Sequence, residues 1–354
     1  MYLDDKIHNI PDLRRVGLHP DFWYPLARSG AVKKGQLHSV SFAGEPIVLA
    51  RKKNGEVFAL EDRCAHRQIP LSMGVLEGDR LKCCYHAWEY EESGRVAKIP
   101  YLVKGGHKPP TCVKQYPSRE AYDHIFVYTG TPEKLAQAPF PDLPAWQRSD
   151  FKTMYFEREV ACHYSFMHEN LMDMNHQFLH RKLLGGVKPV LIANEHGDNW
   201  VEASYIFGGG GKRKVGADYL MEGSRKGSST DDDDIMTIRT DYPYQSLTLM
   251  RKGDDEPALH LWSVYIPVNQ DQRVHKSFGM LMIKKPPIPG LIYLFWPFMR
   301  WFTESVFSED RMAVIAEQNA YDRQGGDWNN EVFQLTLDLR EVLIRNGIPI
   351  NAEG

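Results

Sequence analysis

Residues 63–74 (RCAHRQIPLSMG) contain a cysteine and a histidine one residue apart, and residues 81–90 (LKCCYHAWEY) contain a second pair. The paired residues are Cys64 with His66 and Cys83 with His86. Two thiolates and two imidazoles suit a four-ligand site for zinc or iron. Zinc fingers usually group cysteines with cysteines, whereas a two-iron cluster can take both cysteines on one iron and both histidines on the other. The mixed pairs therefore favour the cluster, with a zinc site as the alternative.

The sequence around these pairs predicts an all-β domain. Short segments rich in strand-forming residues alternate with turn signals from about residue 22 to residue 130, and Asn54-Gly55 is a typical hairpin turn. The proline-rich segment 131–146 predicts a connector. We therefore expect a first domain over residues 1–140 and a second over residues 141–354.

The second domain is predicted to be α+β. A helical stretch is expected near residues 164–183, and a helical C-terminus from about residue 309. Strands with little helix between them predict an antiparallel sheet with helices on one side. The expected strands are 200–207, 235–241, 246–251, 259–266 and 277–283.

A second group of metal-binding residue types lies in HENLMDMNHQFLHRK, residues 168–182. On a helix, one face would carry four of them: Asn170, Asp173, His176 and His180. Two histidines with one carboxylate are typical of a mononuclear non-haem iron(II) that activates O₂. The carboxylate must come from elsewhere in the chain. Two other nearby histidines fit no such spacing and are interpreted as ordinary polar residues: His163 and His168.

The pairs Cys-x-His and Cys-x-x-His, with CCYHAW in place of Cys-Pro-Tyr-His-Gly-Trp, resemble the Rieske [2Fe–2S] domain. Cys84 replaces the usual proline and Ala87 the usual glycine, and neither is a ligand position. From FWYPLA at residues 22–27 to the C-terminal helices, the chain resembles the oxygenase subunits of Rieske non-haem iron oxygenases, in particular alpha-only O-demethylases. The resemblance implies a cluster on the two Cys/His pairs and a helix-grip fold for the second domain.

The resemblance also implies roles at the second metal. FSEDRMAVIAEQ resembles the segment that carries the third iron ligand, which favours Asp310, with Glu309 and Glu317 as alternatives. His176 and His180 would be the other ligands, and Asn170 a neighbour of the site. Family members are usually head-to-tail trimers. Asp173 would then join the two metal sites by accepting hydrogen bonds from His176 and from His86 of the neighbouring subunit.

These features predict a terminal oxygenase. No Gly-x-Gly-x-x-Gly segment follows a predicted strand, so electrons from NAD(P)H are expected through a separate reductase, with or without a ferredoxin. The expected reaction is hydroxylation or oxidative demethylation of an apolar substrate, either aromatic or polycyclic as in sterols and terpenoids; dihydroxylation stays open. The alternatives are a Rieske electron carrier and a zinc-stabilised binding protein.

Charge and hydropathy exclude several other classes. The formal charge of −3 gives no field that attracts nucleic acid. The N-terminal residues are acidic where a secretion signal is basic, which predicts a cytoplasmic location. The apolar run 289–302 is too short to span a bilayer. It is interpreted as a core helix buried against a sheet, as a substrate entrance or as a peripheral membrane contact.

Overall fold

The computed structural model describes residues 12–103, 106, 110–209 and 234–350. The chain forms two compact units. The N-terminal unit comprises His19–Asp142 together with Ile266–Gln272. The C-terminal unit comprises the described residues up to Leu18, Leu143–Tyr265 and those from Arg273 onward.

The N-terminal unit is built from three small antiparallel sheets, as predicted, with strand orders β10-β5-β4-β3, β11-β12-β2 and β6-β7-β8-β9. The predicted hairpin at Asn54-Gly55 joins β4 to β5, and Gly55 takes the left-handed conformation (φ 104°) that glycine adopts without strain. The strands are β2 Trp23–Arg28, β3 Leu37–Phe42, β4 Glu45–Arg51, β5 Val57–Glu61, β6 Val75–Glu77, β7 Arg80–Lys82, β8 Glu89–Tyr90, β9 Val96–Lys98, β10 Gln115–Tyr116, β11 Ser118–Ala121 and β12 His124–Tyr128. The short helices are η2 Ser29–Ala31, η3 Leu71–Met73 and η4 Pro132–Gln137.

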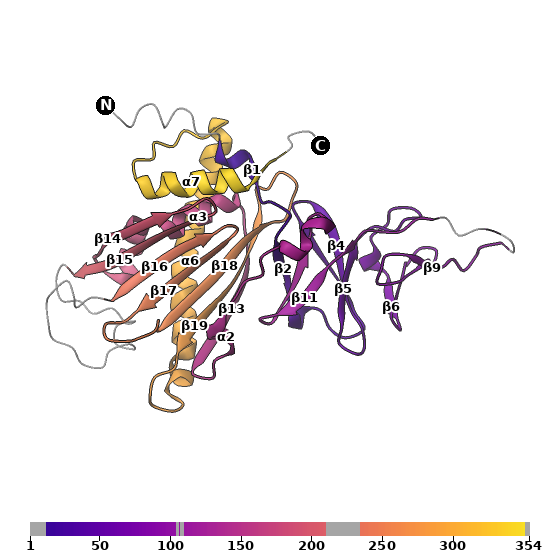
Figure 1. Cartoon of the computed structure of the whole chain (residues 1–354), viewed down its shortest axis with the longest axis horizontal. Coiled ribbons are helices and arrows are strands. Elements are labelled where there is room, and N and C mark those ends of the chain that lie inside the picture. Colours follow the sequence, from indigo (N-terminus) through magenta and orange to yellow (C-terminus); the bar gives the residue numbers. More distant parts are fainter. Residues whose placement is uncertain (1–11, 104–105, 107–109, 210–233, 351–354) are drawn as a thin grey trace. The chain divides into compact units, whose positions relative to one another are not determined.

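The C-terminal unit is a seven-stranded antiparallel sheet with helices, which confirms the predicted α+β class. Its strand order is β13-β19-β18-β17-β16-β15-β14, and the long helix α6 runs along one face (Figure 1). The strands are β13 Phe151–Val160, β14 Val187–His196, β15 Trp200–Gly209, β16 Ile235–Asp241, β17 Tyr244–Met250, β18 Leu259–Pro267 and β19 His275–Lys284. The helices are α2 Pro144–Gln147, α3 Tyr164–Met172, η5 Met174–Phe178, α4 Arg181–Leu184, α6 Leu291–Gln324 and α7 Gln334–Asn346. The short elements near the chain ends are η1 Leu13–Arg15, β1 Val16–Gly17 and β20 Ile348–Pro349.

Ion pairs hold α3 beside α7. Glu169 on α3 pairs with Arg14 of η1 and with Arg340 of α7, and all three side chains are almost fully buried. The Arg14 guanidinium also stacks on the Phe166 ring. Breaking such a buried pair leaves an uncompensated charge, so this network fixes the position of α3.

Three sequence predictions about this unit were wrong. Strands β13 and β14 were missed, and the helical C-terminus expected from about residue 309 is continuous with the helix over the apolar run, so that α6 begins at Leu291. The helix expected over 164–183 ends at Met172, and two short helical turns follow it. The first half of α6 forms despite Pro297 because its side chains pack on the sheet: Ile292, Trp296 and Met299 contact a buried cluster that includes Met154, Leu281 and Ile283. No helix in the described part of the chain is long and apolar enough to cross a membrane.

Candidate metal centres

Two hairpin-like loops at the end of the N-terminal unit present the Cys/His pairs. In the first loop, the amide of Cys64 donates to the carbonyl of Ile69 (2.9 Å); in the second, the amide of Cys83 donates to the carbonyl of Trp88 (2.9 Å). Both cysteines belong to the buried core of the unit. The sequence thus places each thiol inside the domain, and each histidine follows it toward the surface.

The four donors are arranged as two pairs. The Cys64 and Cys83 thiols are buried next to each other, while the rings of His66 and His86 lie nearer the surface with their centroids 4.6 Å apart. Zinc bonds of about 2.0–2.3 Å would bring tetrahedral ligand atoms within about 4 Å of one another. Among the described residues, the only group of three or more such donors within 4.8 Å lies in the other unit. The paired arrangement fits a two-iron cluster and not a single zinc ion.

The local environment of the thiols also fits a cationic group. Burial raises the pKa of Cys83, and the neighbouring Cys64 raises it further, so the Cys83 thiol stays neutral unless a positive charge shares its pocket. The Tyr90 hydroxyl lies 3.1 Å from the Cys64 sulfur and accepts a hydrogen bond from the amide of Ala65. Ala87, at the position of the family's glycine, has a left-handed backbone with φ 54°. Its conformation explains why glycine is favoured there.

In the C-terminal unit, the structure brings together His176, His180 and Asp310, whose candidate ligand atoms all lie within 4.8 Å of one another. Nε2 of His180 is 3.0 Å from Asp310 Oδ1, and Nε2 of His176 is 3.7 Å from the same oxygen. Asp310 lies on α6, whereas the histidines lie on η5 and at the start of α4. Because the helix breaks after α3, the two histidines turn toward α6. The three side chains therefore come together without the straight helix that the sequence predicted.

Hydrogen bonds at Nδ1 orient both imidazoles. His176 Nδ1 lies 2.6 Å from the carbonyl of Asp173, and His180 Nδ1 lies 2.7 Å from the Glu309 carboxylate. Acceptors at Nδ1 place the proton there and leave Nε2 of each ring as a lone-pair donor. His180 Nε2 is buried, and although Asp310 Oδ1 lies 3.0 Å away, no hydrogen bond to this nitrogen is formed by the described residues. A buried nitrogen lone pair that faces a carboxylate is the arrangement expected around a metal ion.

The charges of the side chains in this group also favour a metal ion. Burial lowers the pKa of His180, but the Asp310 and Glu309 carboxylates outweigh it and raise the pKa above its ordinary value. A positive charge is thus favoured between these side chains. Asn170 donates a hydrogen bond of 3.4 Å to Asp310 Oδ1, so it lies beside the group.

One predicted contact differs. The carboxylate of Asp173 does not accept from His176; it accepts from the amide and the side chain of Asn175, and His176 is bound by the Asp173 carbonyl instead. Asp173 ends α3, and in this position its side chain caps the next helical turn, a common use of aspartate that competes with longer-range contacts. Of the alternative third ligands, Glu309 contacts His180 Nδ1, and Glu317 is not part of the group.

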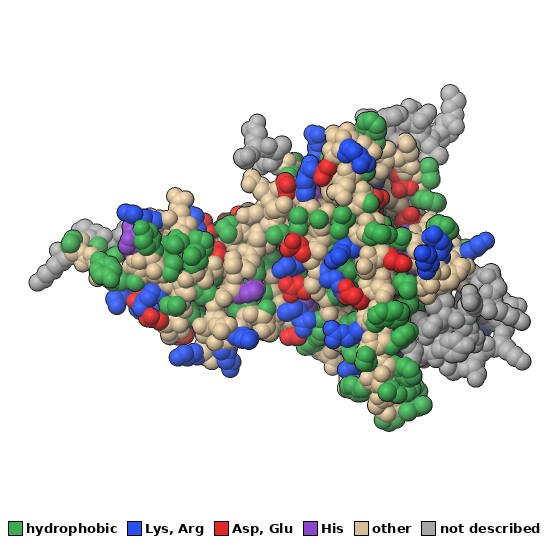
Figure 2. Space-filling view, turned by 180° about the vertical axis from the view of Figure 1, so that it is seen from behind, with side chains coloured by type: hydrophobic (Ala, Val, Ile, Leu, Met, Phe, Trp, Pro, Cys, Tyr) green, Lys and Arg blue, Asp and Glu red, His purple; other side chains and the backbone are tan. Residues whose placement is uncertain are grey.

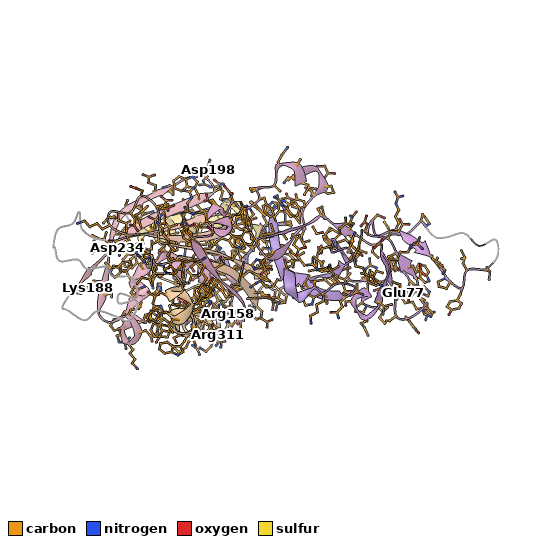
Figure 3. All side chains as sticks on the ribbon, turned by 90° about the horizontal axis from the view of Figure 1, so that it is seen from below. Glu77, Arg158, Lys188, Asp198, Asp234 and Arg311 are labelled. Carbon is orange, nitrogen blue, oxygen red and sulfur yellow. The ribbon has the colours of Figure 1, made fainter. Side chains whose placement is uncertain are left out.

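An apolar cavity of about 310 Å³ adjoins the His/His/Asp group. Its wall on the sheet side includes Leu261 and Leu281, and its wall on α6 includes Phe298 and Phe302. At the rim, Arg158 on β13, labelled in Figure 3, pairs with Glu304 of α6 and lies 4.4 Å from the centre of the Phe307 ring. The cavity therefore offers a water-poor space that ends at the candidate metal group.

Comparison with known proteins identifies the family. Residues 22–117 match the Rieske [2Fe-2S] domain, and residues 160–345 match the vanillate O-demethylase oxygenase C-terminal domain. The second match alone covers more than half of the chain. The chain belongs to the Rieske non-haem iron oxygenases. It is an oxidoreductase with a [2Fe–2S] cluster and a mononuclear iron, and it acts as a terminal oxygenase that receives electrons from a separate component.

Relatives of this oxygenase include the 4β-methylsterol monooxygenase of Methylococcus capsulatus, which is 29% identical over 326 residues and matches 88% of this chain and 84% of that protein. The chlorophyllide a oxygenase of Arabidopsis thaliana is 23% identical over 335 residues, covering 93% of this chain and 57% of that protein. A crystal structure of dicamba monooxygenase superposes with a TM-score of 0.73 at 21% identity, over 93% of this chain and 96% of that one. That structural likeness shows the shared fold.

Sequence reasoning misjudged two buried histidines of the oxygenase. His163 and His168 are not ordinary polar residues but fully buried core residues. His163 caps α3 by accepting from the Ser165 amide, whereas neither ring nitrogen of His168 has a hydrogen-bond partner in the described part of the chain. Burial, with a smaller effect of His275, lowers the pKa of His168 to about 3. Both rings are therefore neutral components of the core, a role that their spacing alone did not indicate.

A second cavity, of about 700 Å³, also reaches the metal group in the same unit. Asp173 and Arg340 line it, while Asn170 and His176 line both this cavity and the apolar one. The oxygenase thus has an apolar approach and a polar approach to the same histidine.

Proposed function

We propose that His176, His180 and Asp310 hold the mononuclear iron and that Cys64, His66, Cys83 and His86 hold the cluster. The proposal is supported by the convergence of the first three side chains and by the paired arrangement of the other four. When bound, the cluster supplies electrons and the iron(II) supplies O₂ activation.

The neighbouring residues position these ligands. The Asp173 carbonyl and the Glu309 carboxylate hold the Nδ1 protons of the two histidines, so that Nε2 of each ring is free to bind. Asn170 holds Asp310 from the side of α3. The apolar walls exclude water from the reacting part of a bound substrate, which limits unproductive use of O₂.

We infer that the substrate is a bulky apolar molecule, polycyclic or aromatic, which is hydroxylated or oxidatively demethylated. The observation that carries this inference is the apolar cavity that ends at the His/His/Asp group. Its lining of Leu, Ile, Met and Phe side chains offers little to a small anionic acid. The relative that acts on methylsterol matches most of the chain, in line with a polycyclic substrate.

Electrons are proposed to reach the iron through Asp173 in a head-to-tail homotrimer. The polar cavity beside Asp173 and His176 offers a concave surface for the cluster end of a neighbouring subunit. At that end, Tyr85 and Met73 are exposed near the partly exposed His86. Exposed apolar residues of this kind suit an interface. Asp173 would then accept from His86 of the neighbour, and a reductase or ferredoxin supplies the cluster. The cytoplasmic location stays a prediction.

Turnover with a reductase tests the proposal. The oxygenase should consume O₂ and NADH in proportion to a lipophilic polycyclic substrate, and His176→Ala should abolish product while keeping the cluster spectrum. Asp173→Asn should keep both metals and slow electron transfer, and sedimentation should give a trimer. Coupled turnover of small benzoates with no response to polycyclic compounds would overturn the substrate assignment.

A further inference from the structure

The first half of α6 has three faces with different surroundings. One packs on the sheet through Ile292, Trp296 and Met299. A second lines the apolar cavity through Phe302 and Val306. The third is exposed and carries Tyr293, Leu294 and Trp301, which are 58%, 74% and 57% exposed. An amphipathic helix normally has one apolar face, so the third face is unexplained by the fold.

The exposed face is rich in the residue types found at membrane interfaces. Tyrosine and tryptophan are enriched there because one end of the ring is apolar and the other is polar. Between residues 284 and 303 the chain has three basic residues, Lys284, Lys285 and Arg300, and no acidic residue. Lys284 pairs with Glu256, so the charges offered to an anionic surface are those of Lys285 and Arg300. Lys152 of β13 adds a further cation and lies 4.1 Å from the centre of the Tyr293 ring. Figure 2 shows hydrophobic side chains gathered along this end of the unit with basic side chains beside them.

The exposed face is continuous with the apolar cavity. Phe298 lines the cavity and is also 39% exposed. Its ring is 5.6 Å from that of the exposed Trp301 and 6.3 Å from that of the cavity residue Phe302. An apolar path therefore leads along aromatic side chains from the surface of α6 to the cavity.

We propose that this face, formed by Tyr293, Leu294, Phe298 and Trp301, binds the interfacial region of an anionic lipid bilayer. The helix lies on the membrane and does not cross it. The exposed aromatic and aliphatic side chains enter the boundary between headgroups and acyl chains, and Lys285 and Arg300 contact the anionic headgroups. A second copy of the chain would not require a local excess of basic residues, which is why the bilayer is the favoured occupant.

The position of Phe298 links the membrane contact to the uptake of substrate. A lipophilic substrate can pass from the bilayer to the cavity along Phe298 without entering water, and this consequence rests on the proposed function. Binding to the bilayer does not rest on it, because the exposed face and its charges are independent of turnover.

Vesicle co-sedimentation of the metal-loaded protein tests the proposal. The wild type should bind vesicles of phosphatidylcholine with about 30% phosphatidylglycerol, bind pure phosphatidylcholine more weakly, and lose affinity as salt rises. The double substitution Leu294→Ser and Trp301→Ser should weaken partitioning at least about tenfold, equal to about 1.4 kcal/mol. Lys285→Gln with Arg300→Gln should remove the preference for the anionic lipid.

Met312→Ser is the matched control, because Met312 is 60% exposed on the same helix beyond the cavity. Its partitioning should equal that of the wild type. The cluster absorbance of every variant checks that the protein is folded. Wild-type protein that stays in the supernatant, or equal loss in the control, would contradict the proposal. So would dissociation of an oligomer by the double variant without any change in lipid binding, because a second copy would then cover the face.

Activity separates this proposal from the proposed function. With an apolar substrate supplied in vesicles, the double variant should show a raised KM and an unchanged kcat, and with the same substrate in detergent it should match the wild type. If the wild type does not bind vesicles, the proposed membrane contact is wrong. Binding without turnover of any apolar substrate overturns the proposed function and leaves the membrane contact standing.

Discussion

Glu309 is predicted to tune the affinity of the iron site without binding the metal. Its carboxylate accepts the Nδ1 proton of His180 over 2.7 Å, and its side chain is 28% exposed while that of His180 is 1% exposed. A hydrogen bond to a charged group contributes about 1.5–3 kcal/mol, and the partial exposure of Glu309 places this one near the lower end. Since about 1.4 kcal/mol is a factor of ten, Glu309→Ala should weaken iron(II) binding about tenfold. Glu309→Gln should weaken it less, because the amide oxygen still accepts a hydrogen bond.

Chelator competition on the reconstituted protein measures this affinity, with the cluster spectrum recorded on the same samples. Glu157→Gln is the matched control: Glu157 is 30% exposed and pairs with Lys276, but it is not part of the metal group. Its iron affinity should be unchanged. If Glu309→Ala binds iron as tightly as the wild type, the reasoning about His180 is wrong. Loss of iron as complete as in a His180 variant would make Glu309 itself a ligand.

Three further predictions concern stability. Ala87→Gly should raise the midpoint temperature of cluster loss, which is followed by visible absorbance. The substitution relieves the strain of an alanine in the left-handed conformation, which costs about 1 kcal/mol. A lower midpoint would show that Ala87 is unstrained. Leu60→Ala should lower the free energy of unfolding, measured with denaturant, by about 2–5 kcal/mol, because Leu60 is fully buried in the core that holds the cluster cysteines. A decrease below about 1 kcal/mol, typical of a surface substitution, would contradict this prediction. The folded-state pKa of His168, about 3, lies below its unfolded value, so its contribution is complete above about pH 6.5 and is lost as pH falls toward 3. His168→Phe should therefore reduce the slope of unfolding free energy against pH between about 5.5 and 4 by about one proton, or about 1.4 kcal/mol per pH unit; an unchanged slope would mean that His168 is charged in the fold.

The cluster unit was predictable because its signals are local. Cys64 with His66 and Cys83 with His86 lie within single loops, and the Asn54-Gly55 hairpin depends on neighbouring residues alone. Asp310 was found only through resemblance, because a ligand supplied by a distant helix leaves no spacing in the sequence.

The errors arose where tertiary packing overrode local preference. The expected helix is broken at Asp173, which caps the turn that carries His176. The helix over the apolar run was not expected to continue into the C-terminal helix, because aromatic residues and Pro297 are poor helix formers; contacts with the sheet hold this part of α6. Strand β14 is largely exposed at the edge of the sheet, so it lacks the alternation of apolar and polar residues that identifies a strand.

Quantitative iron and acid-labile sulfide analysis of the wild type and of Asp310→Ala tests the central claim most directly. The wild type should contain about three irons and about two sulfides per chain. Asp310→Ala should keep about two irons, the sulfides and the cluster spectrum, and lose the third iron together with oxygenation. Zinc without sulfide in the wild type, or a full iron content with activity in Asp310→Ala, would contradict the assignment of the two metal sites.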